Sequence, residues 1–136
     1  MSVSFSKFQP FVEKLAEKTF NLQSDTLKVA LTNSAPAGTE SQLSQITEIS
    51  YTNLSARTLT VSSSAQTSGT YKLVIADLTL TATGAVGPFR YIVIYDDTAT
   101  NDELIGYYDY GSNVTMASGD SFPLDFDGSA GLFTLV

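Results

Sequence analysis

The chain has 136 residues, of which 43% are hydrophobic, and its formal net charge at pH 7 is −7. This length suits a single domain, and the hydrophobic content supports an ordinary core and excludes disorder. The chain has no cysteine and no histidine, which excludes disulfides, thiol chemistry, histidine-dependent hydrolysis and the usual zinc ligands. The acidic balance argues against nucleic acid or an anionic membrane as a partner.

No apolar run is long enough for a membrane span or a secretory signal. We therefore expect the protein to stay in the compartment where it is made. The basic residues are unevenly placed, since four of the five lysines lie in the first 28 residues. The chemistry that remains open is that of carboxylates, lysine, tyrosine and metals with oxygen ligands.

Residues 5–20 have the apolar spacing of an amphipathic helix. Phe8, Val12, Leu15 and Ala16 follow the i, i+4, i+7, i+8 pattern of one stripe. Pro10 favours a start in the first turn, where its missing N–H does little harm. We interpret the segment as a helix that caps a sheet; the alternative is an N-terminal arm that docks on a partner.

The chain then changes to the alternating pattern of strands. Residues 26–32 alternate as a half-buried strand, 33–42 have the composition of a loop, and 43–49 fit either one helical turn or an irregular link. Residues 52–70 are dominated by Ser and Thr, with Arg57 as the only charge and a strand pattern over 57–63. Residues 71–82 form a strand pattern whose phase changes at Ala76 and Asp77, which indicates a bulge or bend.

The rest of the sequence is a series of short strand patterns separated by turns rich in Gly, Asn and Asp. These patterns cover residues 89–96, 103–110, 113–116, 121–127 and 131–136. One helix followed by many short strands is typical of a mainly β protein. We predict one antiparallel β-sandwich domain over residues 1–136, with a jelly roll as one possible topology and residues 5–20 as an N-terminal helix.

Two acidic segments could in principle carry chemistry. The segment "DFDGSAG", residues 125–131, begins like a calcium loop but lacks the later acidic ligand. Strand alternation places Phe122, Leu124 and Phe126 inward and Asp125 and Asp127 outward. We interpret this segment as a solvated strand that enters a turn, and we expect no metal and no cofactor.

The second acidic segment holds Asp96, Asp97, Asp102 and Glu103. A pair of carboxylates can perform acid–base catalysis if burial raises the pKa of one of them. Because these four lie in a sequence typical of a turn, we expect solvent to keep their pKa values ordinary. We predict no catalytic residues and no enzymatic activity.

Three tyrosines, Tyr107, Tyr108 and Tyr110, cluster in "GYYDYG". Alternation places Tyr108 and Tyr110 on one face of a strand and Tyr107 on the other with Asp109. Exposed tyrosines can stack on sugars or anchor a protein interface. We therefore take the three as interface candidates, although half of the cluster could belong to the core.

Arg90 lies beside the most strand-like run in the chain, Tyr91–Tyr95. Alternation groups Phe89 with Tyr91 on one face and Arg90 on the other. A charge beside such a run needs a partner, because an unpaired buried charge is unfavourable. We predict a structural ion pair with Asp109 on the neighbouring strand, with Asp77 as the rival partner and a ligand-binding role as the alternative.

Four phrases of the sequence, taken in order, resemble small structural proteins of tailed bacteriophages, namely capsid decoration or cement proteins and similar virion components. The phrases are "LAEKTFNLQSDTLKVALTNSAPA", "ITEI", "GPFRYIVIYDDTATNDELIGYYDYG" and "GDSFPLDFD". The resemblance runs from about Leu15 to Leu135. It departs at residues 50–69, where such proteins often carry a Gly-rich phrase.

The resemblance implies a protein made in the host cytoplasm that binds the outside of an assembled capsid and braces it. It implies the major capsid protein as partner and a homo-oligomer, with a trimer favoured. The alternatives are another virion component, such as a tail or head–tail joining protein, and a carbohydrate-binding β-sandwich module that uses the tyrosines of "GYYDYG".

Overall fold

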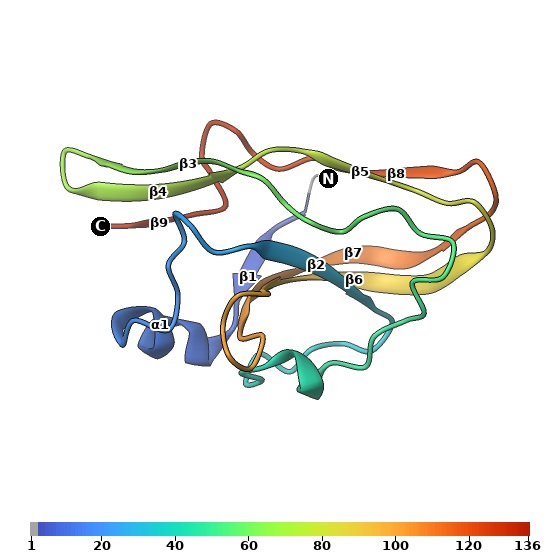
Figure 1. Ribbon diagram of the computed structural model, residues 1–136, viewed down its shortest axis with the longest axis horizontal. Coiled ribbons are helices and arrows are strands. Elements are labelled where there is room, and N and C mark those ends of the chain that lie inside the picture. The colour runs from blue at the N-terminus through green and yellow to red at the C-terminus, as the bar shows by residue number, and fades with distance from the viewer. Residues whose placement is uncertain (1–2) are drawn as a thin grey trace.

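The computed structural model describes residues 3–136 as two layers of antiparallel strands, with a short helix at one end (Figure 1). Together they form a mainly β, sandwich-like fold with an N-terminal helix, as the sequence predicts. The elements, in chain order, are β1 (Phe5–Lys7), α1 (Gln9–Ala16), β2 (Leu27–Thr32), the 3-10 turn η1 (Leu43–Gln45), β3 (Val61–Thr67), β4 (Thr70–Ile75), β5 (Leu78–Thr81), β6 (Val86–Asp96), β7 (Leu104–Met116), β8 (Ser121–Leu124) and β9 (Phe133–Leu135).

The central sheet has the order β1-β7-β6-β2. Its longest pairing is the β6–β7 hairpin, in which Ile92 lies opposite Tyr108. The register of this hairpin shifts between Phe89 and Tyr91. Phe89 consequently packs on Phe122 in the upper layer, with ring centroids 5.4 Å apart, whereas Tyr91 lines a hollow on the opposite face. The prediction that Phe89 and Tyr91 share a face is wrong, because the irregularity changes the phase.

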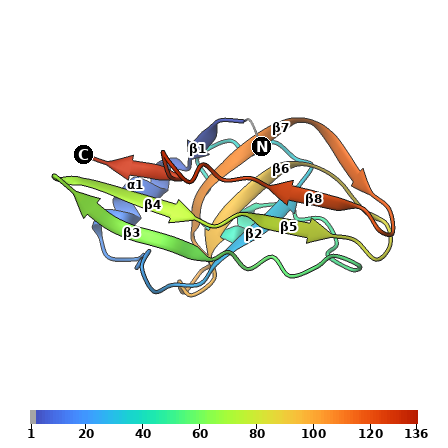
Figure 2. The ribbon, with the colours of Figure 1, turned by 90° about the horizontal axis from the view of Figure 1, so that it is seen from above.

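The upper layer is a long ribbon in which β4 runs into β5 and β8 runs towards β9 (Figure 2). β5 pairs with β8, and β4 pairs with both β3 and β9. The ribbon is interrupted at Ala76 and Asp77, where the sequence pattern changes phase. There the Asp77 carboxylate accepts the N–H of Phe126 at 2.8 Å. Opposite this break, the chain between the end of β8 at Leu124 and the start of β9 at Phe133 forms a loop.

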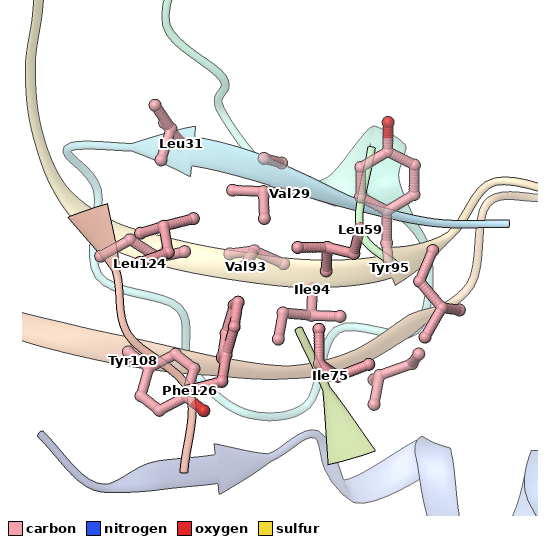
Figure 3. Packing of buried hydrophobic residues seen from close by; sticks show 14 of the residues in the cluster. Val29, Leu31, Leu59, Ile75, Val93, Ile94, Tyr95, Tyr108, Leu124 and Phe126 are labelled. Carbon is pink, nitrogen blue, oxygen red and sulfur yellow. The ribbon is translucent and has the colours of Figure 1, made fainter. Parts of the chain in front are cut away.

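The core lies between the two layers. Figure 3 shows Ile94 of the central sheet close to Ile75, and Tyr108 close to Phe126. The other face of the central sheet is covered by the segment around η1, whose Leu43 and Ile46 pack against the buried cluster. The central strands β2 and β6 are therefore buried on both faces. Within residues 3–136, no helix is long and apolar enough to cross a membrane.

The helix is shorter than predicted. Residues 5–7 pair with β7 as β1, and the helix begins at Gln9, with Pro10 in its first turn, where a missing N–H is tolerated. It ends at Ala16, because Lys18 adopts a left-handed φ of 72°. The N–H groups of Lys18 and Thr19 bond back to the carbonyls of Leu15 and Lys14, which is a Schellman motif.

Candidate functional site

One side of the sandwich is sealed by the segment 48–60, which we call the sealing segment. It bonds to the outer edge of β2, where the N–H of Val29 donates to Arg57 and the N–H of Leu59 donates to Leu27. It also bonds to the upper layer, where the N–H of Ser55 donates to Thr81. The segment appears in green in Figure 1, where it passes between the layers. An unpaired strand edge invites pairing with another chain, and on this side the chain covers the edges of β2 and β5.

Arg57 fastens the sealing segment to β2. Its guanidinium donates to the carbonyl of Val29 at 2.6 Å and lies 3.6 Å from the centroid of the Tyr51 ring. The Tyr51 hydroxyl donates to Glu48 at 2.7 Å and accepts the N–H of Leu31 at 2.9 Å. Burial, followed by the bond to Glu48, raises the pKa of Tyr51. The sequence singles out Arg57 only as the lone charge in its stretch.

The opposite side of the sandwich is open. β1 ends the central sheet there, and β9 ends the three-stranded sheet of the upper layer. Between them lies a groove of about 1000 Å³, which we call the open groove. Its lining is mainly apolar and comes from β1, α1, β9 and the residue before β9: Phe5, Ser6, Lys7, Phe11, Val12, Leu15, Ala16, Leu132, Phe133, Thr134 and Leu135.

The helix is held in place by one face and presents another to the groove. Phe11 is buried and meets the rings of Phe20 and Phe133 at centroid distances of 5.0 and 5.4 Å. Val12 on the next position is 48% exposed, and Leu135 on β9 is 46% exposed. Large side chains this exposed are few in the described chain, and two of them meet in one groove. A concentration of this kind is typical of an interaction surface.

The structure brings Arg90 and Asp109 together. The Arg90 Nε donates to Asp109 Oδ1 at 2.8 Å, and Nη2 donates to Oδ2 at 3.2 Å. The two side chains are 38% and 45% exposed, so this is a surface pair and not the buried charge that the sequence argument assumes. Its bonds to Arg90 and to the N–H of Gly111 lower the pKa of Asp109. The rival partner, Asp77, bonds instead to the N–H of Phe126.

The three tyrosines lie in different surroundings. Tyr108 is buried and packs on Phe126 at a centroid distance of 6.2 Å. Tyr107 is half-buried on the other face and packs on Phe8 at 5.1 Å. Tyr110 is exposed, and its ring contacts the ring of Phe122 at a centroid distance of 5.0 Å. The three therefore do not form one continuous surface, and only Tyr110 presents much of its ring to solvent.

The solvated turn expected for the second acidic segment is wrong for Asp96 and Glu103, because both side chains are buried. Asp96 belongs to the end of β6, and its Oδ1 accepts the N–H groups of Thr98 and Ala99 at 2.9 and 3.1 Å. Its buried Oδ2 finds no donor within residues 3–136. The Asp25 carboxylate adjoins Asp96, and a protonated Asp96 can donate a hydrogen bond to it. Burial, and then this bond, raises the pKa of Asp96 to about 7.

The "DFDGSAG" segment has the alternation that the sequence predicts, with Phe126 buried and Asp125 and Asp127 exposed. The carboxylate of Asp127 accepts the N–H groups of Ser129 and Ala130, each at 2.8 Å, and these bonds lower its pKa. This carboxylate thus organises a turn. Within the described chain, no group of three or more carboxylates is arranged to hold a metal ion.

Comparisons with protein-family models, with curated proteins and with solved structures find no match to this chain. The open groove is accordingly identified from its own geometry. The sequence contained one signal for it, the apolar stripe that includes Val12, Leu15 and Ala16. That stripe lines the groove.

Proposed function

We propose that this chain is a structural protein of a tailed-bacteriophage virion, which binds the outside of the capsid through its open side and stabilises the shell. The single observation that carries a binding role is the contrast between the two sides of the sandwich. The sealing segment covers the edges of β2 and β5 on one side, while β1, β9 and the apolar face of α1 stay uncovered on the other. The phage context comes from the sequence resemblance.

The distribution of charge supports the same role. The chain has twice as many carboxylate as basic side chains, fourteen against seven. The open groove is lined mainly by apolar side chains, with Ser6, Thr134 and one lysine, so the groove differs in character from the acidic remainder. Docking by apolar anchors with an acidic face left to solvent fits a protein that coats an assembly. The expected partner is the major capsid protein, and a small homo-oligomer, with a trimer favoured, is part of the proposal.

The test uses purified protein and empty expanded heads assembled from the major capsid protein of the phage that carries its gene. The protein should sediment with the heads and raise their melting temperature. If it does not sediment with heads, the capsid role is refuted. Binding to tails or to the head–tail joint instead, located by antibody labelling in the electron microscope, would support the rival virion role.

The carbohydrate-binding alternative has less support from the geometry. A sugar platform needs exposed aromatic faces, whereas Tyr108 is buried and Tyr107 is half-covered by Phe8. A glycan array with hits that are lost in Tyr107→Ala would favour this alternative.

A further inference from the structure

The free edge of β9 forms one wall of the open groove. β9 pairs with β4 through Leu73–Phe133, Lys72–Thr134 and Tyr71–Leu135, and it is the last strand of its sheet. All three β9 residues line the groove. An edge of this kind can accept an extended segment of another protein as an added strand, with main-chain hydrogen bonds for affinity and alternate side chains for specificity.

The groove also offers apolar positions to such a segment. Figure 1 shows β9 lying over α1, and both elements line the open groove. Val12 and Leu15 on the helix and Leu135 on β9 would then meet alternate side chains of the added strand. All of β1 also lines the groove, so an extended chain along β9 would contact both β1 and α1.

The charges around the open groove indicate which kind of segment could bind there. Lys7 is the only charged side chain in the lining of the open groove, and the ion pairs within residues 3–136 do not include it. The rest of the protein is strongly acidic. A carboxylate on the incoming segment would therefore meet a lysine that has no competing acidic partner in the described structure.

We propose that the open groove binds an extended segment of the capsid partner, which adds as a strand to the free edge of β9, places apolar residues at alternate positions against α1, and pairs a carboxylate with Lys7. This inference rests on the proposed function for the identity of the partner. The groove chemistry itself can be tested without heads.

The first experiment measures binding to heads with exposed-residue variants that leave the core intact. Val12→Asp should weaken binding at least about tenfold, the equivalent of losing the burial of one aliphatic side chain. Lys7→Glu should also weaken it, whereas Lys14→Glu, which makes the same charge change at a residue of a different cleft, should not. Unchanged binding of Val12→Asp to heads overturns the groove as the docking site and leaves the capsid role standing.

The second experiment selects ligands for the wild-type protein from a random decapeptide library, with Val12→Asp as the control target. Selected peptides should carry apolar residues at alternate positions and at least one Asp or Glu, and Lys7→Glu should lose the acidic preference. A selection that does not differ between wild type and control overturns the groove proposal. So does a wild-type dimer in sedimentation that Val12→Asp converts to a monomer, because a second copy would then be the occupant. If wild type fails to bind heads but selects such peptides, the capsid role fails and the groove chemistry stands.

Discussion

The proton that Asp96 holds beside Asp25 predicts that the protein loses stability as the pH rises through the weakly acidic range. The folded state keeps this proton up to a pKa of about 7, whereas an aspartate in the unfolded chain releases it at about 3.9. Between these values the folded state binds more protons than the unfolded state, so the free energy of unfolding falls with pH. The contribution is complete below about pH 4 and is lost above about pH 7.

The size of the effect follows from the shift. One pKa unit corresponds to about 1.4 kcal/mol, so the free energy of unfolding should fall by up to about 3 kcal/mol between pH 5 and pH 8. Three other shifted carboxylates do not have this effect. The pKa values of Glu40, Asp109 and Asp127 are lowered, so their contributions are lost only below about pH 4. The pKa of Asp102 is raised by burial and then by Asp97, which adds a fall of the same sign.

The decisive variant is Asp96→Asn. An asparagine keeps the oxygen that accepts the N–H groups of Thr98 and Ala99, and its amide N–H can donate to Asp25 at any pH. Urea unfolding at pH 5, 6, 7 and 8, followed by circular dichroism, should give a much flatter profile than wild type and higher stability at pH 8. Asp97→Asn is the matched control, because that neighbour is an exposed partner of Lys28.

A profile that falls just as steeply in Asp96→Asn would show that the proton is not held at this pair. If Asp96→Asn does not fold, Asp25→Asn provides the same test from the other side of the pair. Either single substitution should relieve the repulsion between the carboxylates. The double variant should therefore add little to the gain of one alone.

Three further substitutions test the packing and the surface pair. Arg90→Met should change the melting temperature little, because its bonds to Asp109 are made at an exposed surface; a large loss would show that the pair supports the strands. Phe11→Ala should destabilise the fold by about 3 to 5 kcal/mol in urea unfolding, as for other large buried aromatic residues, and a loss under about 1 kcal/mol would refute its role as the anchor of the helix. Gly106→Ala should displace β1, because an added Cβ would clash with the ring of Phe5; hydrogen exchange over residues 5–7 should increase, and unchanged exchange would contradict the close approach.

The sequence predicted the features of the fold that depend on local alternation. The phase change at Ala76 and Asp77 became the break between β4 and β5. The alternation around Phe126 placed Asp125 and Asp127 outward, as observed. These predictions are correct because a strand with one buried face has an apolar residue at every second position.

The predictions that are wrong concern features that depend on residues far away in the chain. Asp96 has the composition of a turn residue, yet it ends a buried strand and adjoins Asp25 from a loop before β2. The sequence could not show this, because nothing local distinguishes a carboxylate at a buried strand end from one in a solvated turn. The prediction of the face on which Phe89 lies is wrong for a related reason, since a register shift depends on both strands of the β6–β7 hairpin.

The apolar stripe of the helix shows what periodicity can and cannot establish. The stripe predicts the face by which the helix caps a sheet, yet Val12 on this stripe is 48% exposed. Phe11, which is not part of the stripe, is the buried residue that anchors the helix. Periodicity indicates that a face is apolar, but it does not indicate whether the same chain covers it. The same protein covers the outer edge of β2 with its own sealing segment. We therefore propose that the apolar helix face beside the uncovered edges of β1 and β9 is a surface for a partner and not a defect of packing.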